Sequence, residues 1–419
     1  MRRRTFLAKS VISLAGLSLA GRAVGEPTAK SQPKPSDIGA FYPTLQVPSE
    51  TSMGIVWTWK NRQTCSGLVE YASKSDFSDK KTVYAVDPLP FRALSDQLLS
   101  VRIRGLKPNT RYFYRTVNIQ NPGTGRQVVH VGKTYSFKTI GAKADSSFAV
   151  INDTHVNMKT FPELFKRIEA LNPAVTLWNG DVCNYLTYYS YTYSLLKERY
   201  GTVPFAVERP FLYVPGNHDY RGNGARILKR VFLPRLSGER QARYSDLDRN
   251  FAVRVGDIAM VGLDTAEDKD DAHFHGETAF GPYLAFQTEW LADALEQPEI
   301  KNAPYLLVFT HIPLFHPEVL KNPDIRRRGW ANWHTECSRM WSPLITRYGV
   351  QAVISAHTHV YRSFVPSKPY PWYQIIGGGP SLPEATVIDG KVAGNRLKNT
   401  AYHVGRQKIL QEFTFTPRV

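Results

Sequence analysis

Residues 148–155 read FAVINDTH, and residues 174–181 read AVTLWNGD. In both stretches an apolar run of strand length ends in a short turn that carries aspartate. The same arrangement returns where FLYV at 211–214 is followed by PGNHD at 215–219. Short apolar runs bounded by turn residues are typical of strands buried on both faces, as in the parallel sheets of α/β proteins. The pattern therefore predicts an α/β fold from residue 147 onward.

Two later apolar runs also end in histidine. Residues 306–309 precede His311, and residues 352–354 precede His357 and His359. Helical periodicity at 161–171 and again at 286–295 separates the runs, as expected for strands that alternate with helices. In an open α/β sheet, ligands bind at the carboxyl ends of the strands. We therefore expect the polar residues after all five runs to meet at one edge.

These polar residues form a mixed set of oxygen and nitrogen donors without a thiolate. They are two carboxylates, one amide and four imidazoles: Asp153, His155, Asp181, Asn217, His311, His357 and His359. Such a set suits Zn, Fe or Mn. Seven donors are too many for one tetrahedral ion but suit two divalent or trivalent ions that share a bridging carboxylate. Two such ions can activate water and stabilise the oxygens of a reacting phosphate.

Residues 38–140 show a different pattern of short alternating strands. Met53, Ile55 and Trp57 alternate with smaller or polar neighbours, and about a hundred residues of this kind predict a β-sandwich. The stretch GAKADSS at 141–147 interrupts the alternation. We therefore expect a small all-β domain at 38–140 and an α/β domain at 147–419.

The first residues are typical of an export signal. Three arginines at 2–4 precede an apolar run at 11–21 that is too short to cross a bilayer. Paired arginines before an apolar run resemble a twin-arginine signal, so we expect residues 1–25 to direct export to the periplasm or the cell exterior. Residues 26–37 are polar and contain proline, as in a linker. No stretch of the sequence predicts a transmembrane segment.

The motifs DTH (153–155), GD (180–181), GNHD (216–219) and HTH (357–359), with the isolated His311, resemble those of the calcineurin-like metallophosphoesterases. LKPNTRY at 106–112 is similar to the tyrosine corner of a fibronectin type III domain. Together they resemble the purple acid phosphatase branch or its bacterial relatives. The resemblance implies a four-layer α/β sandwich preceded by a fibronectin III-like sandwich, and an acid phosphatase-like enzyme.

The resemblance also implies a role for each motif residue. Asp153, His155, Asp181 and His359 would hold one metal ion. Asp181 would bridge to a second ion, which Asn217, His311 and His357 would complete. His218 would approach the scissile phosphate, and Asp219 would orient the imidazole of His218 by a hydrogen bond. The nucleophile would be a metal-bridged hydroxide.

The sequence departs from the purple acid phosphatases at three positions. Asn184 stands where those enzymes have a tyrosine ligand, and Tyr185 is one residue further on. His155 stands where they have glycine, as in the broader superfamily, so we expect no colour from a tyrosinate bound to iron. Ala356 replaces the glycine that usually precedes HTH.

The net charge of the whole chain is +17, and it falls to +12 when residues 1–25 are removed. A basic protein favours anionic partners. Arginines at 221–243 and at 326–328 are either ordinary solvated surface or a rim that steers an anionic ester toward the metals. No nucleic-acid-binding motif occurs, so we expect a small phosphate ester as the partner and no stable nucleic-acid complex.

The predicted function is therefore hydrolysis of phosphate esters, phosphomonoesters above all, outside the cytoplasm. The first alternative is a phosphodiesterase acting on cyclic nucleotides, nucleic-acid fragments or lipid head groups. A second alternative is an inactive binding module, although every ligand position is filled. The loops at 185–205, 221–250 and 265–285 carry no pattern that identifies a substrate, and the partner of the β-sandwich is not encoded in any motif.

Overall fold

The computed structural model describes residues 42–59, 64–86, 91–120, 125–141, 145–189, 192, 195–196, 206–233, 249–269, 278–317 and 330–418. The expected export signal at 1–25 and linker at 26–37 lie outside these residues. No helix in the described part of the chain combines the length and the apolar character needed to cross a membrane.

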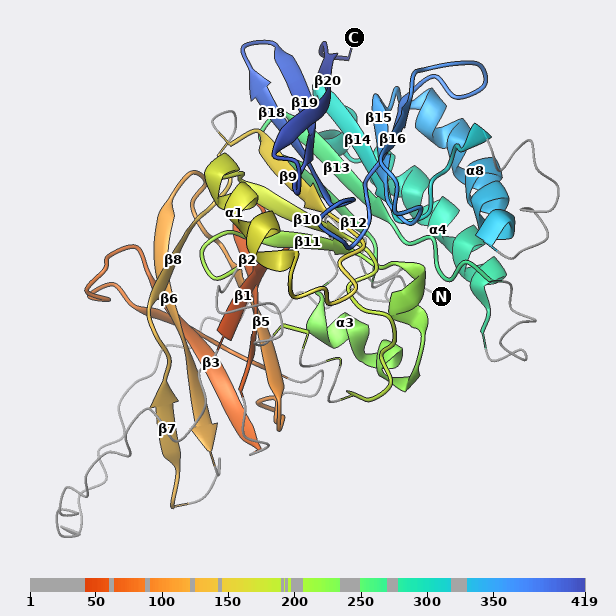
Figure 1. Cartoon of the computed structure of the whole chain (residues 1–419). Helices are drawn as coiled ribbons and strands as arrows, with labels where there is room; N and C mark the ends of the chain where they lie inside the picture. The colour runs from red at the N-terminus through yellow and green to blue at the C-terminus, as the bar shows by residue number, and fades with distance from the viewer. Residues whose placement is uncertain are drawn as a thin grey trace, which may run out of the picture. The chain divides into compact units, whose positions relative to one another are not determined.

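The largest sheet joins nine described strands in the order β20-β19-β18-β9-β10-β11-β1-β2-β5 (Figure 1). Their bounds are β1 (Tyr42–Gln46), β2 (Ser52–Thr58), β5 (Leu98–Arg104), β9 (Ser147–Ile151), β10 (Val175–Asn179), β11 (Phe211–Val214), β18 (Thr386–Ala393), β19 (Arg396–His403) and β20 (Lys408–Phe415). Strands β9, β10 and β11 are parallel, and their residues are almost completely buried. These are the first three apolar runs, and all three form strands as the sequence predicts.

A second sheet joins six described strands in the order β12-β13-β14-β15-β17-β16. Their bounds are β12 (Phe251–Val255), β13 (Ile258–Leu263), β14 (Tyr305–Thr310), β15 (Ala352–Ser355), β16 (Arg362–Phe364) and β17 (Tyr373–Ile376). Strands β14 and β15 are the last two apolar runs, and they are parallel neighbours. The five runs are therefore divided between two sheets instead of lying in one.

Helices cover the outer faces of the two sheets. One core lies between the sheets and joins residues such as Phe148 and Phe309, whose rings meet edge to face. A second core packs α1 (Phe161–Leu171) and the short α3 (Leu228–Val231) on the first sheet, and a third packs α4 (Phe280–Leu295) and α8 (Trp330–Arg347) on the second. The short helix α5 (Pro298–Lys301) follows α4. Two sheets between two helical layers confirm the four-layer α/β sandwich.

The all-β part uses a third sheet with the order β4-β3-β6-β7 and with β8 beside β6. The strands are β3 (Cys65–Ala72), β4 (Lys81–Tyr84), β6 (Arg111–Gln120), β7 (Val128–Val131) and β8 (Tyr135–Lys138). A separate apolar core packs this sheet on β1, β2 and β5. Across that core, Trp57 Nε1 donates to Asn118 Oδ1 at 2.6 Å, and the Tyr112 hydroxyl accepts the backbone N–H of Lys107 at 2.9 Å. The β-sandwich and the geometry of its tyrosine corner agree with the sequence.

One sheet of the sandwich is continuous with the largest sheet of the α/β part. Strand β1 pairs with β2 on one side and, in parallel, with β11 on the other, where Gln46 is opposite Phe211. The Val47 N–H donates to the Phe211 carbonyl at 3.0 Å. An unpaired strand edge is a ready template for another strand, and β11 occupies this one. No local sequence pattern predicts this joint.

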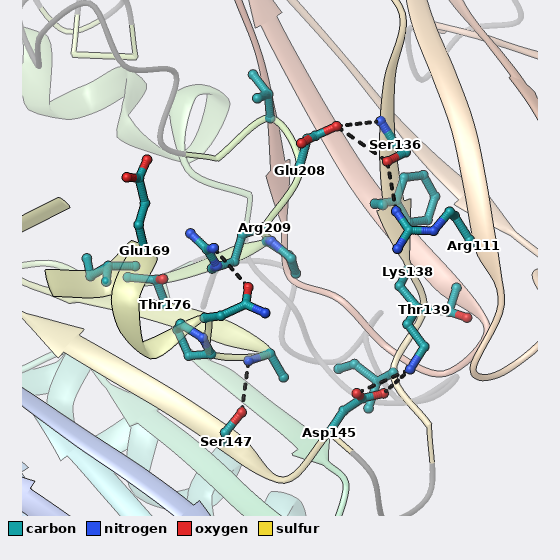
Figure 2. Close-up of a pocket in the computed structure, with 18 of the residues that line it drawn as sticks. Arg111, Ser136, Lys138, Thr139, Asp145, Ser147, Glu169, Thr176, Glu208 and Arg209 are labelled. Carbon is teal, nitrogen blue, oxygen red and sulfur yellow. Dashed lines mark hydrogen bonds and ion pairs between the residues drawn. The ribbon is translucent and has the colours of Figure 1, made fainter. Parts of the chain in front are cut away.

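A cavity of about 550 Å³ lies where the sandwich meets α1 and β10 (Figure 2). Charged side chains line it, and most of them have described partners. Ser136 donates to Glu208, Lys138 is paired with Asp145 at 3.3 Å, and Arg209 donates to Asn172 Oδ1 at 3.0 Å. We call this region the junction cavity.

Candidate metal centre

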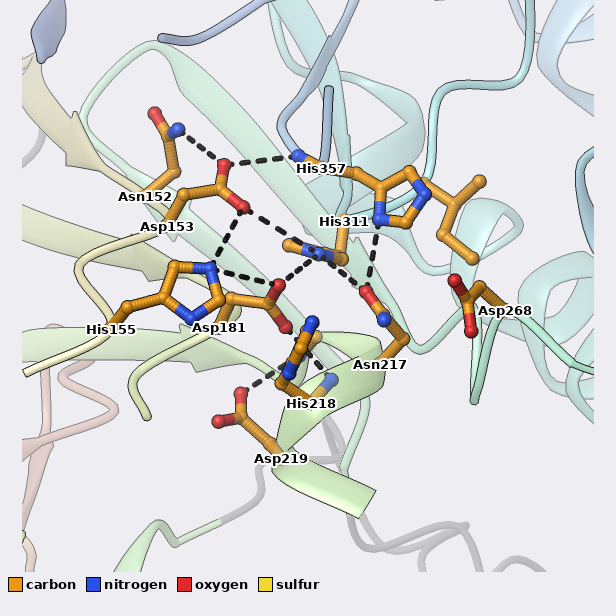
Figure 3. Close-up of polar contacts among 12 residues, drawn as sticks. Asn152, Asp153, His155, Asp181, Asn217, His218, Asp219, Asp268, His311 and His357 are labelled. Carbon is orange, nitrogen blue, oxygen red and sulfur yellow. Dashed lines mark hydrogen bonds and ion pairs between the residues drawn. The ribbon is translucent and has the colours of Figure 1, made fainter. Parts of the chain in front are cut away.

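The seven candidate ligands meet where β9, β10, β11, β14 and β15 end, and Figure 3 labels all of them except His359. Five of them follow their strands in the left-handed backbone region: Asp153, His155, Asp181, His357 and His359, with φ between 44° and 73°. Non-glycine residues are uncommon there, and such strain persists where the surrounding structure imposes it, often at functional sites. The chain thus turns sharply after β9, β10 and β15 and directs these side chains into one cluster.

Glycine permits the close approach of the strand ends. Gly180 has φ +79°, and a Cβ added to it would collide with Nδ1 of His311. Gly216 lies against Asp181 in the same way. Gly180 therefore lets the two sheets approach closely enough for their side chains to share one site, and Gly216 lets the turns after the neighbouring strands β10 and β11 pack together.

The first group of donors comprises Asp153, His155, Asp181 and His359. His155 Nε2 lies 3.4 Å from Asp181 Oδ2, and His359 Nε2 lies 3.4 Å from Asp153 Oδ1. The two Nε2 atoms are 3.1 Å apart. Because the side chain of His359 is 40% exposed while both aspartates are buried, this group opens toward solvent at His359.

The second group comprises Asp181, His311 and His357, with Asn217 between the two imidazoles. His311 Nε2 lies 3.4 Å from Asp181 Oδ2. Asn217 Oδ1 lies 3.1 Å from His311 Nε2 and 2.9 Å from His357 Nδ1. Asp181 Oδ2 is therefore equally distant from an imidazole of each group, as a bridging carboxylate would be.

The hydrogen bonds of two imidazoles set tautomers that make both groups of donors suitable for metal cations. His155 Nδ1 donates to Asn184 Oδ1 at 2.7 Å, and His311 Nδ1 donates to the Asn179 carbonyl at 3.0 Å. In the neutral rings, Nε2 then carries a lone pair that faces other lone pairs, including those of Asn217 Oδ1. Facing lone pairs need a shared cation, and fixing the tautomer through the second nitrogen is typical of metal-bound histidine.

Distances and unsatisfied atoms support the same conclusion. Two donors bound at about 2.0–2.2 Å to one tetrahedral ion lie roughly 3.3–3.6 Å apart, which matches the 3.4 Å separations. Asp153 Oδ2 accepts from Asn152 Nδ2 and the His357 N–H, whereas the buried Oδ1 has no hydrogen-bond partner among the described residues. Buried oxygens are rarely left this way, so the residues present fit a pair of metal ions.

The cluster also sets the ionisation of its central carboxylate. Burial of Asp181 opposes its charge, but the protonated forms of His311 and His155, in which protons take the place of shared metal cations, outweigh burial and hold the pKa of the carboxyl well below its usual range. Asp181 is therefore ready to accept cations at neutral pH.

His218 lies beside the first group. Its backbone N–H donates to Asp181 Oδ1 at 2.9 Å, and its Nδ1 donates to the Asn184 carbonyl at 3.1 Å. The ring meets that of His155 edge to face, with centroids 4.9 Å apart. Burial, with a contribution from the charge of Arg221, lowers the pKa of His218.

Asp219 differs from the expectation that it orients the imidazole of His218. Its carboxylate accepts the N–H groups of Val182 and Gly216 at 3.0 and 2.9 Å and the Tyr213 hydroxyl at 2.8 Å. The side chain is completely buried, and burial followed by the charge of Asp181 raises the pKa of Asp219 to about 7. The short 3₁₀ helix at Asn217–Tyr220 turns this side chain inward, so Asp219 fixes the backbone of the GNHD turn instead of the imidazole.

Arg221 and its two acidic partners are functional candidates that the sequence did not single out. The Arg221 guanidinium lies 3.0 and 3.1 Å from the two ring nitrogens of His218. It also forms a bidentate pair with Glu267 at 2.9 and 2.8 Å and a contact with Asp268 at 3.0 Å. Only 15% of the Arg221 side chain is exposed, so this member of the arginine-rich stretch is not a solvated surface charge. No motif marks the acidic residues, because they come from a loop without a pattern.

Asn184, which departs in sequence from the purple acid phosphatases, supports two histidines of the site. The amide oxygen of Asn184 holds the ring of His155, and the carbonyl of the same residue holds the ring of His218. The two substitutions relative to purple acid phosphatases are therefore complementary, because Asn184 positions the histidine that stands at the glycine position. The arginines at 326–328 and at 235–243 lie outside the described residues.

Comparison with known proteins gives two family matches that together span most of the chain. Residues 146–361 match the calcineurin-like phosphoesterase family, and residues 41–139 match the purple acid phosphatase N-terminal domain. Because the first match covers half of the chain, it assigns the family of the α/β part.

Similar sequences come from Arabidopsis thaliana. Purple acid phosphatase 21 is 25% identical over 339 residues, which cover 78% of this chain and 67% of that protein. Probable purple acid phosphatase 20 is 24% identical over 304 residues, which cover 69% of this chain and 62% of that protein. The chain thus spans about two thirds of the length of these curated relatives.

A solved structure supports the fold. A purple acid phosphatase from seeds of yellow lupin (Lupinus luteus) superposes with a TM-score of 0.66 over 90% of this chain and 74% of that one, at 14% identity. The similarity extends through both the sandwich and the α/β part.

Proposed function

The chain belongs to the calcineurin-like phosphoesterase family, and we propose on this basis that it hydrolyses phosphomonoesters with two metal ions. The observation that carries the proposal is the position of Asp181 Oδ2, 3.4 Å from His155 Nε2 and 3.4 Å from His311 Nε2. One carboxylate oxygen is thereby shared between two groups of donors. The similar phosphatases of Arabidopsis favour the same reaction class.

Each group of donors would hold one ion of the pair. Asp153, His155 and His359 would hold the first ion, Asn217, His311 and His357 the second, and Asp181 both. When bound, such a pair supplies a water molecule of lowered pKa and stabilises negative charge on the oxygens of the reacting phosphate.

The protein's own residues orient and protonate the ester. His218 is held at Nδ1 by the Asn184 carbonyl, and its Nε2, which Arg221 approaches at 3.1 Å, is the ring nitrogen that would deliver a proton to the leaving oxygen. Arg221 keeps a positive charge against that ring, while Glu267 and Asp268 hold the guanidinium in place. Asp219 keeps the turn rigid, so the imidazole starts from a fixed backbone.

The metals we propose are Zn, Mn or Fe, because imidazole and carboxylate donors suit all three. The position of the tyrosine ligand of purple acid phosphatases is occupied by Asn184, and the neighbouring Tyr185 is 58% exposed. We therefore expect a purified protein without a charge-transfer band in the visible spectrum. Mass spectrometry of the bound metals, together with that spectrum, checks both statements.

The location we propose is outside the cytoplasm, by export through a twin-arginine signal at 1–25. A fusion of residues 1–40 to a reporter that is active only after export tests it. Replacing Arg3 and Arg4 with lysine should abolish export, and reporter activity that survives this change would contradict the proposal.

A paired assay tests the proposed reaction. Metal-loaded protein is given p-nitrophenyl phosphate or bis(p-nitrophenyl) phosphate, with and without a chelator. We expect faster turnover of the monoester, loss of turnover in the chelator, and loss in Asp181→Asn, which removes the shared charge. Glu208→Gln, a carboxylate of the junction cavity, is the matched control. Faster turnover of the diester would make the protein a phosphodiesterase, and turnover that survives both the chelator and Asp181→Asn would exclude the metal mechanism.

A further inference from the structure

Three tyrosines are exposed in one short segment, and the first of them lies beside the metal centre. Tyr185, Tyr188 and Tyr189 are 58%, 70% and 51% exposed, and the segment follows the bridging candidate Asp181 by four residues. Buried tyrosine rings usually supply apolar packing, so three exposed rings within five residues form an unusual surface. We call residues 185–189 the tyrosine segment.

Backbone hydrogen bonds fix the tyrosine segment to the chain that follows the GNHD turn. The Leu186 N–H donates to the Arg221 carbonyl at 2.7 Å, and the Leu186 carbonyl accepts the Gly224 N–H at 2.7 Å. Gly222 has φ +98°, and a Cβ there would lie 2.5 Å from the Leu186 carbonyl oxygen. Leu186 itself is buried, so the segment is anchored by its apolar member and its tyrosines point outward from a fixed backbone.

The first ring of the segment lies against the proposed proton donor. The centroid of Tyr185 is 6.3 Å from that of His218, with the rings inclined at 77°. Any ester group that receives a proton from His218 must leave past this imidazole. The ring of Tyr185 is therefore positioned to meet the organic part of the substrate.

Further apolar side chains are exposed after two of the ligand positions. Met158 is 44% exposed and follows His155 by three residues, and Val360 is 48% exposed and follows His359 directly. Apolar and aromatic side chains are thus exposed on the strand-end loops that carry the first group of donors, beside polar ones such as Asn184.

We propose that the tyrosine segment binds an aryl group of the substrate ester, with Tyr185 as the ring that stacks on it. The inference rests on the proposed function, because it gives the class of alcohol in the phosphate ester that the site hydrolyses. Stacking between two aromatic rings adds binding energy beyond the buried area, so an aryl ester gains over an alkyl ester.

Binding of phosphonates tests the inference apart from turnover. Phenylphosphonate and methylphosphonate carry the same charged group on a carbon–phosphorus bond that cannot be hydrolysed, so calorimetry on the metal-loaded protein gives both affinities. We expect Tyr185→Ser to weaken phenylphosphonate roughly tenfold and to leave methylphosphonate unchanged. Tyr185→Phe keeps the ring and should keep the preference. Tyr84→Ser, at a 40% exposed tyrosine of the sandwich, is the matched control.

Two results would overturn the inference. One is an unchanged ratio of the two affinities in Tyr185→Ser, and the other is full phenyl preference in Tyr185→Leu, which would show an apolar contact without stacking. Turnover of p-nitrophenyl phosphate by the wild type reports on the proposed function separately. If the protein prefers phenylphosphonate but hydrolyses no ester, the aryl subsite stands and the proposed function is wrong. If it hydrolyses esters without preferring phenylphosphonate, the proposed function stands and the aryl subsite is wrong.

Discussion

The metal centre and the junction cavity are both lined by charged and polar side chains, but their atoms are arranged differently. In the metal centre, donors from five strand ends converge, lone pairs face each other, and Asp153 Oδ1 has no hydrogen-bond partner among the described residues. In the junction cavity, Glu208, Lys138 and Arg209 have neighbouring hydrogen-bond or ion-pair partners, although the cavity measures about 550 Å³.

The difference shows that the site of chemistry is marked by buried donor atoms that converge without hydrogen-bond partners, and not by the size of a cavity. A paired charge is already stabilised and gains little from a ligand. Facing lone pairs in a buried cluster remain costly until a cation binds between them. The junction cavity is then understood as a space between two packed parts whose charged side chains are largely paired with each other.

The largest expected effect comes from placing a methyl group where the two sheets approach each other at the metal centre. In Gly180→Ala the new Cβ meets His311, and the φ of +79° becomes strained. We expect loss of the second metal ion, at least a hundredfold loss of kcat/KM, and about 2–4 kcal/mol less stability in denaturant unfolding. Gly394→Ala is the control, because Gly394 has φ +60° but open space around it. Two bound metals in Gly180→Ala would contradict the structure.

A smaller effect is expected when only the support of a ligand is removed. Asn184→Ala deletes the oxygen that holds the ring of His155, and such supports change metal affinity by about 10–100-fold. Asn172→Gly deletes an equivalent amide in the junction cavity while permitting the left-handed backbone at that position. Metal titrations of both variants compare the regions directly, and equal losses of affinity would remove the distinction between them.

The Arg221 cluster is expected to have a moderate effect on both stability and activity. Arg221→Gln leaves Glu267, which is completely buried, without its bidentate partner and with only Lys269 Nζ at 4.0 Å, and should cost about 1–3 kcal/mol and roughly tenfold in kcat. Adding Glu267→Gln should restore stability but not kcat, because the charge beside His218 is still missing. If the double variant recovers both, Arg221 is only a structural residue.

The smallest effect belongs to the junction cavity. Glu208→Gln removes a charge that accepts hydrogen bonds from Ser136 near the surface. Because exposed charges of this kind contribute little, we expect less than about 0.5 kcal/mol in thermal or denaturant unfolding and unchanged kcat/KM. A large loss of activity in this variant would connect the cavity to catalysis and reverse the comparison.

Much of the fold and of the donor set could be predicted because the signals are local. Each of the five buried strands is a short apolar run that ends in a turn. The location of the next polar residue, at the carboxyl end of its strand, follows directly from its place in the sequence. The helix at 161–171 shows its buried face in its own periodicity and ends at Asn172, just before a proline. Signals of this kind need no knowledge of distant contacts.

The sequence by itself determined the α/β fold, the all-β part with its tyrosine corner, and the types of donor that follow the strands. Only the tertiary structure decided that the five strands divide between two sheets, that β1 joins the sandwich to β11, that Asp219 bonds to Val182 and Gly216, and that Glu267 pairs with Arg221. Each of these outcomes rests mainly on contacts between residues far apart in the chain. Such contacts depend on which edges and charges remain unsatisfied after the local elements have formed, and that information is not contained in any one stretch of sequence.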